Sequence, residues 1–286
     1  MGHTITYTAY DGTEYALSSL RSDDGALWGN SLMGYDFDAD DTTGLMTRGA
    51  ESFDVTAEFA SVGKANAFVS QVYADAQDGH DGTLEVDGWQ LTCKVKTAAP
   101  ETVMGGHARC SMTIYAKTPL WRRIRSHVLV PSSGTQTDET GLDYPTDYEF
   151  DYSGVMASSA TNIMSVGTAS LLRITFFGPC SSPYARVSVS SGGTTTTNVY
   201  GVDAEATSGE RIVIDPLGIY TIGGSVYKVG QYGERTNLFD KRRRGVEGSG
   251  SYIFQRMPAG EMRVSWPQSF GVTVETIEER GSLPWT

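Results

Sequence analysis

One stretch of this chain has the periodicity of an α-helix, and it lies in the first third of the sequence. Within residues 61–78 the apolar side chains recur at helical spacing: Ala65, Phe68, Val69, Val72 and Ala76. At about 100° per residue these positions form a single stripe, whereas Lys64, Gln71 and Asp75 fall away from it. Ser61 is a candidate N-cap, because its hydroxyl can accept a hydrogen bond from a free amide of the first turn. The sequence therefore predicts one amphipathic helix over 61–78, packed on a core.

Most of the remaining sequence alternates in the manner of β-strands or carries turn residues. The first segment alternates on both sides of Asp11-Gly12, a dipeptide favoured in two-residue hairpin turns. Residues 52–60 alternate and lead into the helix, and Asp87-Gly88 predicts a second hairpin. We therefore expect an N-terminal α+β domain over residues 1–125, in which the helix covers one face of an antiparallel sheet.

The second half of the chain shows strand-like segments without a helical period. Residues 131–161 are rich in Ser, Thr, Asp and Gly, so we predict a linker or extended arm over 126–165. From 166 to 286, short alternating segments are separated by glycine and serine turns, which is typical of a β-sandwich. The predicted fold class is mainly β, with the α+β domain followed by a C-terminal β-sandwich.

The chain is acidic, with a formal net charge of −12 from 22 basic and 34 acidic residues. Such a chain repels phosphate backbones, which disfavours sequence-independent binding of nucleic acid. No run of about 18 apolar residues is present, so we expect no membrane anchor. The N-terminus lacks the basic and apolar regions of a signal peptide, which predicts synthesis in the cytoplasm without export.

Sequence motifs of catalysis and of metal binding are missing from the chain. Of the three cysteines, Cys93 and Cys110 fall in phase with apolar neighbours, which predicts buried free thiols. The sequence has no C-x-x-C, G-x-S-x-G, P-loop or H-E-x-x-H motif, and its four histidines are scattered. We therefore predict no catalytic, cofactor-binding or metal-binding residues and no enzymatic activity. A hydrolase built on unrecognised carboxylates is an alternative.

One basic run and one tryptophan allow two interpretations each. The run comprises Lys241, Arg242, Arg243 and Arg244, and it is either a solvated loop tip or a contact with an acidic partner surface. Trp266 could serve as a platform for a sugar ring, but Arg263 in the same segment faces the opposite side of a strand. We therefore expect Trp266 to lie in the core.

The order of these elements resembles the distal tail protein of siphoviruses, the long-tailed phages. The strand that leads into the helix matches at 52–78, and Thr-Pro-Leu-Trp at 118–121 falls where the first domain of that family ends. In the second half, SYIFQRMPAGEMRVSW at 251–266 is similar to two strands joined by a Pro-x-Gly turn. The C-terminal sequence is similar to the short tail of that family at four positions: Arg280, Gly281, Pro284 and Trp285.

The resemblance implies a structural virion protein located at the tip of the phage tail. In that family, six copies form a ring through their N-terminal domains, and DNA passes through the central channel without specific binding. The hexameric ring joins the tail tube protein to the tail-associated tip protein. The C-terminal galectin-like domains project outward as platforms for a receptor-binding protein. An acidic channel wall would let DNA slide past.

This resemblance suggests candidate partner contacts at the basic run 241–244 and at Pro284 and Trp285. The alternative function is that of a carbohydrate-binding β-sandwich module for attachment to the host surface. A tail-tube protein or another virion component is a further alternative.

Overall fold

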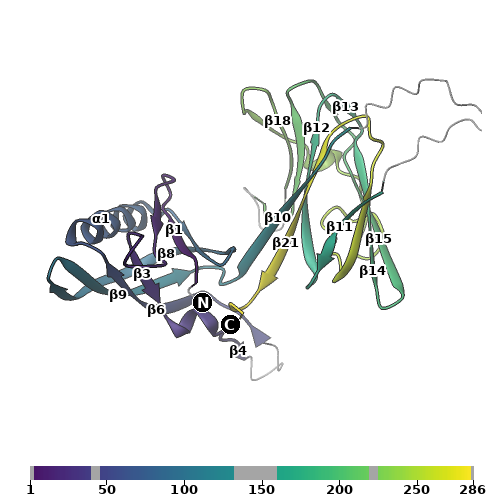
Figure 1. The fold of residues 1–286 in the computed structure, drawn as a ribbon. Coiled ribbons are helices and arrows are strands. Elements are labelled where there is room, and N and C mark those ends of the chain that lie inside the picture. The colour runs from purple at the N-terminus through teal and green to yellow at the C-terminus, as the bar shows by residue number, and fades with distance from the viewer. Residues whose placement is uncertain (1–2, 40–45, 132–159, 219–224, 285–286) are drawn as a thin grey trace, which may run out of the picture. The chain divides into compact units, whose positions relative to one another are not determined.

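The computed structural model describes residues 3–39, 46–131, 160–218 and 225–284, and within them the chain is mainly β with one α-helix. The chain divides into two compact units (Figure 1). The first unit comprises 1–124 together with 279–286, and the second comprises 125–278. No helix in the described ranges is long and apolar enough to cross a membrane.

The predicted helix is present as α1, Val62–Asp78. Its N-cap is Ser61, whose side chain accepts a hydrogen bond from the Lys64 amide at 3.2 Å, as predicted. The helix ends at Gly79, which has a left-handed conformation with φ of 79° that favours glycine. Phe68 packs in the core against Tyr7, Tyr15 and Phe59. The helix and its apolar stripe are confirmed, with one exception at Asp75 that is described below.

Most strands of the first unit belong to two antiparallel sheets, and strand β8 takes part in both. Its elements are β1 (Ile5–Thr8), β2 (Glu14–Ala16), β3 (Gly25–Trp28), η1 (Asn30–Met33), β4 (Asp38–Ala39), β5 (Met46–Thr47), β6 (Glu51–Phe59), β7 (Gly82–Val86), β8 (Trp89–Met104), β9 (His107–Ala116) and β10 (Trp121–Leu129). One strand order is β2-β1-β7-β8-β10, and the other is β3-β6-β9-β8. The first part of β8 pairs with β7 and the rest with β9, so both sheets enclose one hydrophobic core.

Both predicted hairpins in this unit form, but their turns differ in length. Val86 pairs with Trp89, and Asp87 and Gly88 have φ of 50° and 78°, as a two-residue type I′ turn requires. Around Asp11-Gly12 the turn is longer, because the Ala9 amide donates to the Thr13 carbonyl and the Gly12 amide to the Ala9 carbonyl. The loop therefore has three residues, with Gly12 in the left-handed region at φ of 88°.

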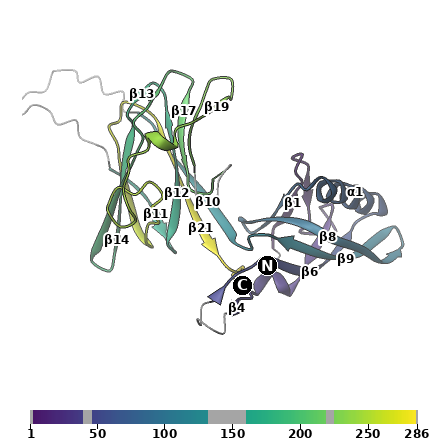
Figure 2. The ribbon, with the colours of Figure 1, turned by 180° about the vertical axis from the view of Figure 1, so that it is seen from behind.

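The second unit contains three antiparallel sheets, of which the two larger ones have one hydrophobic core between them (Figure 2) and the third has only two short strands. Its elements are β11 (Ala160–Val166), β12 (Ser170–Phe177), β13 (Cys180–Ser181), β14 (Tyr184–Ser191), β15 (Thr194–Gly201), β16 (Glu205–Ala206), β17 (Arg211–Asp215), β18 (Ser225–Val229), β19 (Arg235–Asn237), η2 (Phe239–Lys241), β20 (Gly260–Ser265) and β21 (Val272–Arg280). The larger sheet has the order β19-β18-β17-β12-β21-β10, and the smaller has the order β11-β20-β14-β15.

The hairpin expected at 251–266 does not form. Residues 252–255 make a turn, in which the Gln255 amide donates to the Tyr252 carbonyl at 3.1 Å. Side chains, and not a neighbouring strand, donate hydrogen bonds to two carbonyls of this segment. The Asn198 side chain donates to the Tyr252 carbonyl and the Tyr200 hydroxyl donates to the Gln255 carbonyl, each at 2.9 Å. Strand β20 starts only at Gly260 and pairs with β11 and β14.

The predicted boundaries of the linker and of the C-terminal domain also differ from the boundaries of the two structural units. Strand β10 continues to Leu129 and β11 occupies 160–166, so strands extend into both ends of the segment 126–165. Residues 132–159, most of the predicted arm, lie outside the described residues. The tail 279–286 was expected in the C-terminal domain but belongs to the first unit, because Leu283 is buried in that core.

Candidate functional site

The two ends of the described chain meet in the first unit beside the β7–β8 turn. His3 Nδ1 lies 2.6 Å from Asp87 Oδ2, and the Thr4 amide donates to Asp87 Oδ1 at 2.8 Å. The Asp87 amide in turn donates to the Thr4 carbonyl at 2.9 Å. The hydrogen bond from His3 lowers the pKa of Asp87, and the Thr4 amide acts in the same direction. These bonds hold the start of the chain against the turn.

Trp89 follows this turn and lies against two arginines from other strands. Its side chain is buried, with the guanidinium carbon of Arg123 4.6 Å and that of Arg280 5.5 Å from its ring centroid. Both contacts have the geometry of a cation–π interaction. Arg122 on β10 donates to Glu279 on β21 at 3.0 Å. The Arg122–Glu279 pair therefore joins β10 to β21, and one arginine from each of these strands contacts the buried Trp89 ring.

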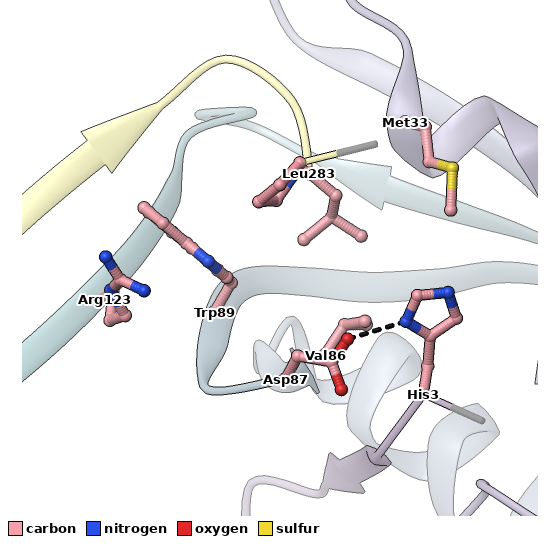
Figure 3. Close-up of a pocket in the computed structure, with 8 residues that line it drawn as sticks. His3, Met33, Val86, Asp87, Trp89, Arg123 and Leu283 are labelled. Carbon is pink, nitrogen blue, oxygen red and sulfur yellow. Dashed lines mark hydrogen bonds and ion pairs between the residues drawn. The ribbon is translucent and has the colours of Figure 1, made fainter. Parts of the chain in front are cut away.

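The C-terminal tail packs beside this indole and lines a small cavity of about 190 Å³. Leu283 is buried, and its amide approaches the Leu32 carbonyl at 3.5 Å. Gly281 lies against Arg48, whose Nη1 would be 2.6 Å from a Cβ at that position. Figure 3 shows the cavity, with the His3–Asp87 pair on one side and Leu283 above it. Its lining residues are His3, Met33, Val86, Asp87, Trp89, Arg123, Leu283 and Pro284.

The cavity is lined by apolar side chains, one guanidinium and one histidine–carboxylate pair. No serine or cysteine nucleophile is among its lining residues, so the pair has no group to activate there. Pro284, a predicted contact, lines the cavity, and Trp285 lies outside the described residues. The arrangement is suited to holding the chain ends in place.

The basic run lies in the second unit, and its four side chains are not equivalent. Arg242 stacks on Phe239, with 3.7 Å between its guanidinium carbon and the ring centroid. Arg243 lies 3.4 Å from Asp203 and over the Tyr184 ring. Lys241 and Arg244 are exposed. The structure therefore places two of the four cations in intramolecular contacts and leaves two facing solvent.

The thiols and Trp266 are buried or held by neighbours. Burial raises the pKa of Cys93 to about 12 and also raises the pKa values of Cys110 and Cys180, so none is an activated thiolate. Trp266 is 3% exposed and its Nε1 donates to the Phe270 carbonyl at 3.1 Å, as expected of a core residue. Within the described ranges, no group of three or more His, Cys, Asp or Glu side chains is placed to hold a metal.

Sequence reasoning missed the cluster around Trp89. Arg123 is 34 positions from Trp89 and Arg280 is 191 positions away, so no local motif joins them. One signal was available, because Trp89 directly follows the predicted Asp87-Gly88 turn and is in phase with Leu91 and Cys93. That phase indicates burial but does not identify the arginines.

Comparisons with known proteins give matches of fold only. No family model matches the sequence, and no curated protein matches it. Two structures of the phage p2 baseplate in its activated conformation contain a chain of similar fold, one with Ca and one with Sr. Each is 12% identical to this chain, and the alignment covers 99% of both chains, with TM-scores of 0.54 and 0.53. The chain has the fold of a phage baseplate component.

A third structure is the SPP1 Dit protein, described as a paradigm of the hub adsorption apparatus in phages that infect Gram-positive bacteria. It is 11% identical, the alignment covers 97% of this chain and 99% of that one, and the TM-score is 0.47. The resemblance predicted from the order of the elements is thus confirmed at the level of the fold by the two p2 structures.

Proposed function

We propose that this protein is a structural component of a phage virion, located in the baseplate hub at the distal end of the tail. The observation that carries the proposal is the match of fold over 99% of both chains to a component of the phage p2 baseplate. A match over the whole length involves both units and the order in which they follow each other. A chance likeness of one β domain would involve only part of the chain.

In this proposal the first unit forms a hexameric ring and the second is a galectin-like β-sandwich that faces outward. A ring requires two different surfaces on each copy that fit each other, and it closes when the rotation between copies fits. The ring would join the tail tube protein to the tip protein and allow DNA to pass through the channel without specific binding. The outward units would carry a receptor-binding protein, and the basic run is a candidate contact.

The proposed role is structural and not enzymatic. Burial raises the pKa of Cys93, and the described residues that line the cavity beside His3 and Asp87 include no serine or cysteine. In the carbohydrate-binding alternative, Trp266 was the candidate platform for a sugar ring. This residue lies in the core, and its ring nitrogen donates to the Phe270 carbonyl, so it does not offer that platform.

Electron microscopy of the purified full chain tests this proposal. We expect closed rings with a central hole and six-fold class averages. Light scattering after size exclusion should give a mass of about 185 kDa, six times the 30.9 kDa of one chain. Monomers that form no rings, even at concentrations of tens of micromolar and together with purified tail tube protein, would contradict the proposal.

A further inference from the structure

Strand β8 is longer than its neighbour β7, and one of its edges is open as a result. β7 pairs with β8 only from Trp89 to Cys93. On the other edge, β10 meets Gln90 and β9 continues the pairing from Lys94 to Met104. The β7 side of residues 96–104 has no paired strand in the described chain, and these residues are exposed or half-buried. Such an edge presents free amides and carbonyls that can pair with another chain.

Other sheet edges of the first unit are covered by the chain itself. At β2, the Ala16 amide donates to the Asp24 carboxylate at 3.2 Å, and the Asp24 amide donates to the Ala16 carbonyl at 2.9 Å. At β3, the Leu27 amide donates to the Leu17 carbonyl at 2.9 Å, and Ser18 forms a bridge with Ala26. The open edge of β8 therefore contrasts with edges that this chain protects.

A groove of about 370 Å³ runs along this open edge, between β8 and helix α1. The helix lies over β8 in Figure 1, and Tyr73 on its groove side is 68% exposed. The residues of the helix wall are Val69, Val72, Tyr73, Ala76 and Gln77. The residues of the strand wall are Val95, Lys96, Thr97 and Ala98. An open strand edge beside an apolar helix face is the arrangement that accepts an added strand.

We propose that the groove between α1 and β8 binds an extended segment of a partner protein, which adds a strand to β8. The β-bulges between Val95 and Thr97 and between Pro100 and Thr102 limit regular pairing to about four residues near 97–100. Proline has no amide to donate, so Pro100 ends the paired stretch. The segment carries apolar side chains at alternate positions, which pack on Val69, Tyr73 and Ala76.

The charge of the groove indicates a second feature of the partner segment, in addition to its apolar side chains. Lys96 is the charged side chain in the groove lining, it is exposed, and it makes no ion pair with a described residue. The segment therefore carries a carboxylate opposite Lys96. The β2 and β3 edges of a second copy cannot supply the added strand, because they are already bonded. The inference does not depend on the proposed hub function.

Selection from a library of random decapeptides displayed on phage, panned against the immobilised full chain, tests the proposal. We expect enrichment of peptides with alternating apolar residues and one Asp or Glu. Hydrogen exchange should slow at the Ala98 amide when an enriched peptide is bound, because this amide faces the open edge, whereas the pairs Thr97–Thr113 and Ala99–Ser111 already face β9. Ala76→Trp fills the groove and should raise the Kd of the labelled peptide more than tenfold in fluorescence anisotropy.

Ala74→Trp is the matched control, because it makes the same change at an exposed position of α1 outside the groove. We expect it to leave the Kd within twofold. Lys96→Glu, at an exposed position, tests the charge even if Ala76→Trp fails to fold, and it should also weaken binding more than tenfold. The proposal is overturned if no peptide is enriched, if both tryptophan variants bind alike, or if the Ala98 amide is not protected. It is also overturned if Ala76→Trp, but not Ala74→Trp, dissociates oligomers of the chain, because a second copy then fills the groove.

Discussion

At the scale of single residues, Asp75 shows what a helical wheel does not capture. Its position places it off the apolar stripe, yet it is only 6% exposed. Its carboxylate accepts hydrogen bonds from the Tyr10 amide and from Gln71 Nε2, each at 3.1 Å. The wheel describes apolar contacts within one helix, and the partner that buries Asp75 is a backbone group 65 positions away.

Asp75→Ala should therefore destabilise the protein by about 1–3 kcal/mol, because the partly buried Tyr10 amide loses its acceptor. Urea unfolding measures this difference. Asp78→Ala removes an exposed carboxylate from the same helix and should change stability by less than about 0.5 kcal/mol. Equal effects of the two substitutions would show that the Tyr10 contact does not stabilise the fold.

The pair of His3 and Asp87 predicts a dependence on pH. The pKa of Asp87 is lowered in the folded state by its hydrogen bond to His3, so the unfolded chain binds a proton more readily. The contribution of Asp87 is present above the unfolded pKa, about 3.9, and is lost as the pH falls through the lower folded value. The effect is small because the side chain is partly exposed.

We expect Asp87→Asn to be less stable than the wild type by under about 1 kcal/mol at pH 6, with the difference shrinking toward pH 3. Asparagine tolerates the positive φ of 50° at this position, so the turn itself is retained. Urea unfolding at both pH values measures the change. A difference that stays constant or grows on acidification would contradict the assigned hydrogen bond.

At the scale of elements, local turn chemistry could be predicted and long-range pairing could not. Asp87-Gly88 marks a two-residue hairpin because both positions need positive φ, and the structure has that turn. Residues 251–254 look like a strand, but Asn198 and Tyr200 satisfy the carbonyls of this segment from a strand more than fifty positions earlier. The Trp89 cluster escaped prediction for the same reason, since its arginines come from distant strands.

The α1–β8 groove belongs to the same scale, and part of its signal was in the sequence. Before the Asp87-Gly88 turn the sequence alternates over residues 84–86, and after it over residues 89–95, so the sequence itself indicates two strands of unequal length. An unequal pair must leave an edge open or give it to a third strand. The sequence does not say which, because it does not show that β9 pairs with the edge of β8 opposite β7.

At the scale of the whole molecule, the chain crosses between its units twice, and sequence reasoning recognised only the first crossing. Composition marks a change near residue 125, where β10 leaves the first unit. The return occurs within β21, a regular strand without a change of composition. The burial of Leu283 in the core of the first unit, together with the contacts of Glu279 with Arg122 and of Arg280 with Trp89, identifies the tail as part of that unit.

This return predicts that Leu283→Ala destabilises the first unit by about 2–4 kcal/mol, since a buried leucine is replaced by a cavity. Tryptophan fluorescence in a Trp266→Phe background isolates that unit, because the other four tryptophans, Trp28, Trp89, Trp121 and Trp285, all belong to it. Val103→Ala, at a position of the same unit that is 59% exposed, is the control and should change stability by under about 0.5 kcal/mol. If Leu283→Ala were as mild as that control, the tail would not be part of the core, and the first unit would end at β10.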